Sequence, residues 1–283
     1  IEEARLTVIA VRANQFPFLD ISAFGGRGRQ SRELVPGSSS DDRFLLAGDL
    51  TYQVDLWGEF RRSTEASLAD LLATEYAYRT VTISLVSEVA RTYLLLRDLD
   101  ERLDISQRTE KTRQDSLVIV QARFDKGIVP ELDVYQAQIE LAVAEAATAS
   151  FQRQIVQTEN ALRILLGRNP GPVTRGVELA SQTFPPAIPA GLPSELLQRR
   201  PDVVQAEANL MAATAQVGIA EALRYPSISL TGRFGAESMD LSDLNSGDAE
   251  TWSIGANILA PIFKSGQLKA QAEAARERAK QSV

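Results

Sequence analysis

The feature that most constrains the fold is a long stretch without helix breakers, because neither Pro nor Gly occurs between Gly58 and Gly127. Apolar residues recur there at the three-four spacing of a helix face, namely Val86, Val89, Tyr93, Leu96, Leu99 and Leu103. A helix continuing to Asp125 would be roughly 100 Å long. A periodic pattern of that length favours a coiled coil over a globular helix.

A second helix follows a short turn. The run Gly127-Ile128-Val129-Pro130 interrupts the first helix, and Pro130 and Asp133 suit the first turn of the next one. We expect this helix to run from Glu131 to Leu166 and to end at the Gly- and Pro-rich residues 167–172. Its many alanines either allow close helix packing or simply reflect helix propensity, and the sequence leaves both readings open.

The return path is predicted to be irregular and then helical. Residues 168–193 are rich in Pro and Gly, a short helix is expected around Ser194 to Gln198, and Pro201 begins a helix that ends at Arg224. The helices at 131–166 and 201–224 together would reach roughly 90 Å if stacked end to end, close to the length of the long helix. We therefore expect a tall wall of continuous helices beside pairs of half-length ones.

The chain contains an internal repeat. The segment Phe16–Ser22 returns as Tyr225–Thr231, and Gly48–Gly58 returns as Gly255–Gly266, so a helix-strand-loop-strand-helix unit occurs twice. The expected segments are the end of a helix (1–14), a first transmembrane β-hairpin (15–57), the long helix with its tip and return helix (58–167), an irregular connector (168–200), a helix (201–224), a second transmembrane β-hairpin (225–264) and the start of a second long helix (265–283).

The hairpins show an alternation of apolar and polar residues that predicts strands with two different faces. Any single strand would also suit a soluble, half-buried sheet. Their length of about 10 to 12 residues favours membrane crossing, and because four strands cannot close a barrel, several chains would have to share one. The expected lipid-facing residues are Leu50, Tyr52, Val54, Ile228, Leu230, Trp252, Ile254 and Ile258. The expected lumen residues are Asp20, Asp49, Asp55, Arg233 and Asn257, which would make a mostly acidic interior or simply a solvated face.

Composition removes several classes of function. The chain has no Cys and no His, which excludes thiol nucleophiles, imidazole catalysis and zinc sites built on these residues. A net charge of -7 argues against nucleic-acid binding. Adjacent acids such as Glu2-Glu3 and Asp41-Asp42 lack the context of a carboxylate-dependent enzyme, so we expect no enzyme, cofactor or metal. No transmembrane helix or signal peptide is expected, and the helical start suggests that the true N-terminus is missing.

Four motifs resemble a known family. They are PSELLQRRPD at 193–202, YPSISLTG at 225–232, GIVPELDV at 127–134 and NALRILLGRNP at 160–170. In these motifs and their order, the chain resembles the outer-membrane factor family of TolC/NodT-type efflux proteins, and more closely the branch that serves resistance-nodulation-division drug pumps.

This resemblance implies a homotrimer in the outer membrane of a Gram-negative bacterium, with a twelve-stranded β-barrel above a periplasmic α-helical barrel. It would be a passive exit duct for small molecules delivered by an inner-membrane resistance-nodulation-division transporter and a periplasmic membrane-fusion adaptor. A TolC-like channel for protein secretion and a soluble coiled-coil scaffold remain the alternatives.

The chain also departs from the family pattern. By repeat symmetry about 110 further residues should follow Gly266, and the lipidated Cys common near mature N-termini is absent, so we expect a fragment. Family gating residues lie mainly in a helical tip that this sequence lacks, and none is assigned. The turn between the two long helices is predicted either to dock the adaptor or to be an ordinary turn. Its residues are Arg123, Asp125, Lys126, Gly127, Ile128, Val129, Leu132 and Asp133.

Overall fold

The computed structural model describes residues 1–29, 33, 40–183 and 199–282. The chain divides into two compact units. One comprises Ile1–Arg79 and Pro193–Val283, and the other comprises Thr80–Leu192. The first unit holds both hairpins and the helices next to them in sequence, while the second holds the helical turn and most of the connector.

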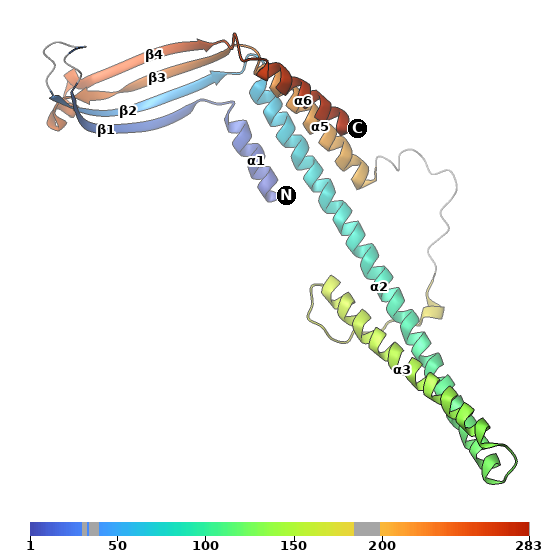
Figure 1. Ribbon diagram of the computed structural model, residues 1–283. Helices are drawn as coiled ribbons and strands as arrows, with labels where there is room; N and C mark the ends of the chain where they lie inside the picture. Colours follow the sequence, from blue (N-terminus) through green and yellow to red (C-terminus); the bar gives the residue numbers. More distant parts are fainter. Residues whose placement is uncertain (30–32, 34–39, 184–198, 283) are drawn as a thin grey trace. The chain divides into compact units, whose positions relative to one another are not determined.

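The first unit contains a four-stranded antiparallel sheet (Figure 1). Its strands are β1 (Phe18–Arg29), β2 (Ser40–Val54), β3 (Ser227–Ser238) and β4 (Glu250–Leu259), and they lie in the order β1-β2-β3-β4. The prediction of two hairpins with four long strands is confirmed. Because β2 pairs with β3, the two hairpins join into one sheet with β1 and β4 at its edges.

The register aligns polar residues with polar residues across all four strands. Asp49 lies opposite Asp20 on one side and Arg233 on the other, and Arg233 lies opposite Ser253. Since side chains alternate between faces along a strand, this shared register collects the charged row on one face and most of the large apolar residues on the other. The exceptions include Phe18, Phe24 and Leu45, which share the face of Asp49. The two-faced pattern predicted from the sequence is therefore confirmed.

One glycine allows the two hairpins to approach closely. Gly235 lies opposite Ala47, and a Cβ atom at Gly235 would lie 2.7 Å from the Cβ of Ala47 and would also collide with the carbonyl oxygen of Leu46. Ala47 itself is only 3% exposed. A side chain at position 235 would therefore separate β2 from β3.

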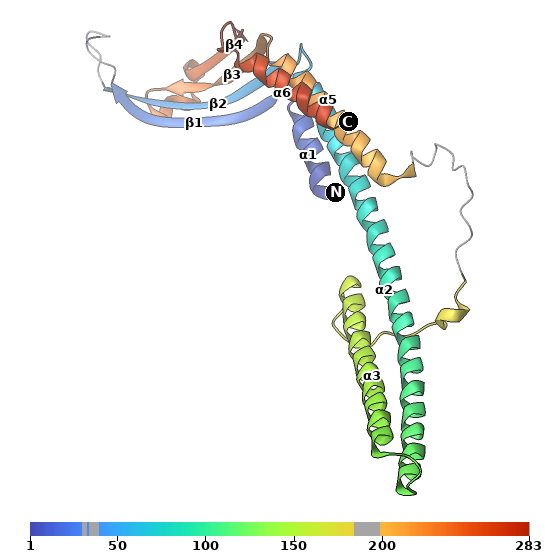
Figure 2. The ribbon, with the colours of Figure 1, turned by 45° about the vertical axis from the view of Figure 1, so that its right-hand side comes forward.

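The helices of the first unit pack through small residues. They are α1 (Glu2–Ala13), the beginning of α2 (Glu59–Asp125), α5 (Pro201–Ala222) and α6 (Gln267–Gln281). Their buried residues are mostly alanines: Ala66, Ala69, Ala73, Ala208, Ala212, Ala215, Ala222, Ala272 and Ala275. Figures 1 and 2 both show α5 and α6 side by side, and Arg276 of α6 pairs with Glu221 of α5 at 2.6 Å. The alanines whose close packing the sequence left open lie instead on the helix at Glu131–Leu165, where Ala144 is the one buried alanine.

The second unit is an antiparallel helical hairpin formed by the rest of α2 and by α3 (Glu131–Leu165). Its core contains Leu96, Leu99, Ile155 and Leu162. Toward the turn, the interface between α2 and α3 continues with polar contacts. They include a 3.1 Å hydrogen bond between the hydroxyls of Ser106 and Thr148. The predicted helices thus have the observed bounds to within two residues at each end.

Some predictions concern residues or relations outside this description. The short helix expected around Ser194 to Gln198 lies outside the described residues. In the described connector, the regular element is η1, a 3-10 helix at Leu179–Ser181. The end-to-end stacking of α3 and α5 relates residues of different units and stays a prediction. No helix among the residues described is both long and apolar enough to cross a membrane.

Candidate functional site

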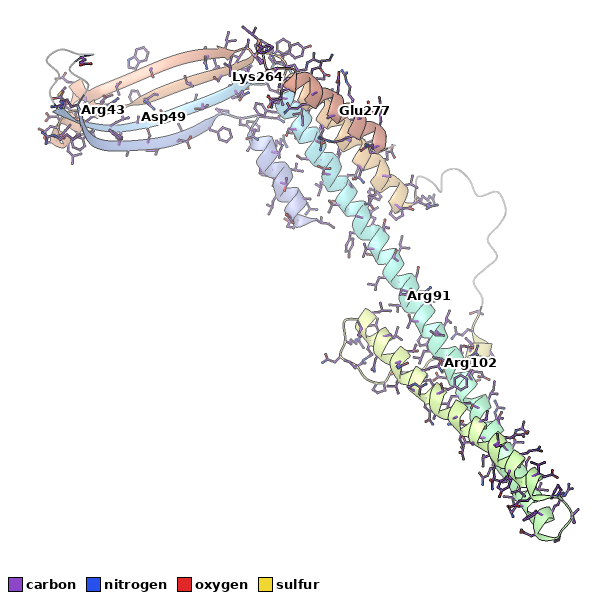
Figure 3. The ribbon with its side chains drawn as sticks, viewed as in Figure 1. Arg43, Asp49, Arg91, Arg102, Lys264 and Glu277 are labelled. Atoms are coloured by element: carbon purple, nitrogen blue, oxygen red, sulfur yellow. The ribbon has the colours of Figure 1, made fainter. Side chains whose placement is uncertain are left out.

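The polar face of the sheet carries a hydrogen-bonded charge pair that joins the two hairpins. The Arg233 guanidinium donates to Asp49 Oδ1 at 2.6 Å, and the Ser22 hydroxyl donates to Asp49 Oδ2 at 2.6 Å. Nearer the first hairpin loop, Arg43 and Glu237 form a second cross-strand pair at 2.7 Å. Figure 3 labels Asp49 and Arg43 on β2. The polar face is therefore built from charges that are mostly matched within the chain.

Four of the five residues predicted to line a lumen lie on this face. Asp20, Asp49 and Arg233 share one row, and Asn257 lies further along β4, opposite Ser229. Asp55 does not belong to the strand, which ends at Val54. Its carboxylate accepts hydrogen bonds from the backbone N–H groups of Phe60 and Arg61, at 3.2 and 2.9 Å. Asp55 therefore caps the beginning of α2.

The opposite face of the sheet is apolar and open. All eight predicted lipid-facing residues lie on it. They occupy the rows Gly48–Phe234–Trp252, Leu50–Gly232–Ile254, Tyr52–Leu230–Ala256 and Val54–Ile228–Ile258. Ile254 is 84% exposed and Ile258 is 66% exposed, although both are large apolar side chains. No α-helix in the described part of the chain packs on the sheet. An apolar surface of this extent is typical of a site that contacts a partner or a membrane.

Aromatic and apolar residues gather where the strands meet the helices. Trp57 stacks on Tyr225 with ring centroids 4.6 Å apart, and its indole N–H donates to the carbonyl oxygen of Pro226 at 2.7 Å. Ile262 and Phe263, which follow β4, are 96% and 83% exposed. Trp57 and Phe263 were not predicted as site residues from the sequence, although aromatic side chains next to strand ends are typical of a membrane interface.

The turn between α2 and α3 brings the eight predicted docking residues into one short segment. Gly127 adopts a left-handed conformation with φ of 69°, and its N–H and that of Ile128 donate to the carbonyls of Phe124 and Arg123, at 2.7 and 3.0 Å. This geometry is a Schellman motif, which ends a helix and requires glycine at its left-handed position. Ile128 and Leu132 are 67% and 61% exposed, so the turn presents apolar side chains beside charged ones.

A half-buried ionic cluster, which we call the Arg175 clamp, fixes the connector to the helical hairpin. Arg175 donates to both carboxylate oxygens of Asp100 on α2, at 2.8 and 3.0 Å, and to Glu159 on α3. Glu159 also accepts from the backbone N–H of Val173 at 3.1 Å, and the N–H of Gly176 donates to the hydroxyl of Tyr93 at 2.9 Å. Sequence reasoning missed this cluster because the connector has no periodicity.

Electrostatics favour the charged form of every member of the clamp. Burial raises the pKa of Asp100, but the hydrogen bonds and charge of Arg175 outweigh burial, so the pKa of Asp100 lies below its ordinary value. The same balance, with a hydrogen bond from Val173, lowers the pKa of Glu159. Hydrogen bonding to Asp100 raises the pKa of Arg175. The clamp is therefore fully ionised at neutral pH.

The described residues contain no group of three or more His, Cys, Asp or Glu side chains arranged to hold a metal ion.

Comparisons with known proteins agree with these features. The model of the outer membrane efflux protein family matches residues 1–168 and 192–283. Solvent efflux pump outer membrane protein SrpC of Pseudomonas putida is 37% identical over 273 residues, which cover 95% of this chain and 58% of SrpC. Cation efflux system protein CusC of Escherichia coli is 33% identical over 284 residues, which cover all of this chain and 61% of CusC. The chain thus spans less than two thirds of either relative.

A solved structure agrees over nearly the whole chain. The crystal structure of a membrane protein from Pseudomonas aeruginosa superposes with a TM-score of 0.93 at 34% identity. The match covers 99% of this chain and 66% of that protein.

Proposed function

Because the chain belongs to the outer membrane efflux protein family, we propose that it contributes four strands to an outer-membrane channel, the exit duct of a tripartite efflux pump. The observation that carries this proposal is the two-faced sheet. Its apolar face is open, with Ile254 84% exposed, while its other face holds the Asp49–Arg233 pair. Lipid on the first side and water on the second would satisfy both faces.

The free edges of the sheet support a shared barrel. Within the described chain β1 and β4 each pair on one side only. An open sheet edge in lipid leaves backbone groups without hydrogen-bond partners, so the edges must pair with other strands. Three copies would give a closed barrel of about twelve strands, which is within the range of outer-membrane barrels. We therefore propose a homotrimer surrounded by outer-membrane lipid, in a Gram-negative bacterium.

The helices extend the proposed duct away from the membrane. We propose that they form a periplasmic helical barrel, that the turn between α2 and α3 meets a periplasmic adaptor, and that an inner-membrane resistance-nodulation-division transporter supplies the energy. The protein would then be a passive conduit and not an enzyme. The names of the relatives mention solvent and cation efflux, which supports small molecules as the transported class.

Conductance of the full-length protein in planar bilayers tests the channel directly. We expect discrete, long-lived conductance steps from protein whose mass in detergent equals three chains. A protein that partitions into water as a monomer and gives no conductance would contradict the proposal, and it would favour a coiled-coil scaffold.

The adaptor contact has its own test. Replacing Ile128 and Val129 together by Asp should abolish drug export while leaving the trimer intact, because two charges would replace the apolar part of the turn. The matched control is Gln152→Asp with Gln157→Asp, which adds the same charge to exposed positions of α3. Normal export by the Ile128/Val129 variant would remove this turn from the mechanism.

A further inference from the structure

The charged side chains in the middle of the polar face are unequally matched. Asp49 receives both the Arg233 guanidinium and the Ser22 hydroxyl, each at 2.6 Å. Asp20 is exposed and forms no ion pair or side-chain hydrogen bond with any residue in the described ranges. Toward the first hairpin loop, Arg43 and Glu237 neutralise each other at 2.7 Å.

The register places this imbalance in one row. Asp20, Asp49, Arg233 and Ser253 lie side by side across β1, β2, β3 and β4. The row contains two carboxylates and one guanidinium, so it carries one negative charge in excess. Because the guanidinium is hydrogen-bonded to Asp49, the excess charge is located on Asp20.

We propose that Asp20 is the residue that gives the channel a preference for cations, whereas the more conspicuous Asp49 contributes little. This inference rests on the proposed function, since it requires the polar face to line a water-filled bore. In a trimer, three copies would place three unpaired carboxylates at equivalent positions around that bore. A fixed charge in a pore raises the local concentration of ions of the opposite sign.

The opposite behaviour of the paired charges distinguishes this mechanism from a general acidic lining. Neutralising Asp20 should remove cation preference. Neutralising Arg233 should increase it, because Asp49 then becomes an unpaired carboxylate. Neutralising Asp49 and Arg233 together should leave the preference unchanged, because this pair carries no net charge either before or after the substitutions.

The experiment measures reversal potentials of the full-length protein in planar bilayers separating unequal KCl solutions. At about 10 mM salt, where the Debye length is about 30 Å, we expect Asp20→Asn to lower the K⁺/Cl⁻ permeability ratio roughly threefold. Arg233→Gln should raise the ratio by a similar factor, and the double variant Asp49→Asn with Arg233→Gln should match the unmodified protein. At about 1 M salt, where the Debye length is about 3 Å, all the differences should vanish.

The outcomes separate failure of this inference from failure of the proposed function. If the unmodified protein does not conduct at all, the channel proposal falls. If it conducts and the Asp20→Asn ratio is unchanged, or if the double variant shifts the ratio as much as Asp20→Asn does, the role of Asp20 is overturned. Should Asp20→Asn fail to form trimers, Asp20→Ser provides the same measurement. Serine already occurs on the same face of β1, at Ser22.

Discussion

The sheet and the α2–α3 hairpin are both long antiparallel assemblies, but they place their apolar residues oppositely. In the helical hairpin, Leu96 and Leu162 are 0% and 2% exposed, and they meet in a core between the two helices. In the sheet, Ile21 and Ile254 are 83% and 84% exposed, and the described chain offers nothing to cover them. The helical hairpin satisfies its own hydrophobic surface, whereas the sheet depends on its surroundings.

Polar groups show the reverse arrangement. The helical hairpin encloses the Arg175 clamp, whose acidic side chains are 23% and 13% exposed. The sheet keeps its charges on an open face, where Arg233 is 45% exposed. This difference indicates that the helical hairpin is stabilised from within, while the sheet has one apolar and one polar face, as the proposed barrel would require.

The largest expected effect tests the apolar face of the sheet. Ile254→Lys places a charge at the centre of β4, and it should destabilise the folded full-length protein in lipid vesicles by about 2–4 kcal/mol, the cost of a cation near the bilayer midplane. Urea titration of the vesicle-inserted protein measures the free energy of unfolding.

Asn257→Lys is the matched control for that variant. It adds the same charge to the same strand but on the polar face, where water would solvate it. Equal destabilisation by the two lysines would show that the two faces do not differ in their surroundings, and the comparison would fail.

The second prediction concerns the clamp. Arg175→Ala leaves Asp100 and Glu159 without their shared partner, and it should cost the connector about 1–3 kcal/mol of local stability. Hydrogen exchange at the backbone N–H groups of Val173 and Gly176 measures this cost directly. The control is Arg168→Ala, which removes an exposed arginine from the same segment. Unchanged exchange at both amides would mean that the clamp does not fix the connector.

Acid should loosen the same contact. Because the pKa values of Asp100 and Glu159 are lowered in the folded state, their contribution is complete above the ordinary carboxylate pKa of about 4 and is lost as the pH falls through the lowered values. Protection of Gly176 should therefore be constant from neutral pH down to about 5 and then decrease below about 4. In Arg175→Ala the decrease should disappear.

The smallest expected effect tests the turn. Gly127→Ala forces a side chain into the left-handed conformation and should cost about 1 kcal/mol, seen as faster exchange of the Ile128 amide. Gly247→Ala is the control, because Gly247 has an ordinary φ and open space around its Cβ position. Equal effects of the two substitutions would contradict the role of the turn geometry.

Sequence reasoning predicted the features that depend on local periodicity. The alternation around Leu50 fixed which residues share a face, because a strand repeats every two residues. It failed at Asp55, which continues the alternation by one position after the strand has ended at Val54. The backbone N–H groups that Asp55 caps belong to the next helix, and nothing in the alternation reveals where the strand gives way to it.

Features that depend on distant partners could not be predicted in this way. Arg175 contacts Asp100, 75 residues away, and Glu159, 16 residues away. Its neighbours in sequence include no repeated pattern that would identify either acid. The uneven pairing of Asp20 and Asp49 likewise could be recognised only from the register between β1, β2 and β3. In the alternating pattern of its own strand, each of the two residues is simply an acid on the polar face.

The narrow approach at Gly235 has a consequence for how the two hairpins find each other. Sliding β3 past β2 by two positions would keep every side chain on its present face of the sheet. The hydrophobic pattern alone therefore cannot distinguish that misalignment from the native register. The slide would, however, bring Arg233 or Glu237 against Ala47, where only a hydrogen atom fits, and would separate Asp49 from Arg233. The absence of a side chain at Gly235 and the Asp49–Arg233 ion pair therefore both favour the native register over this misalignment.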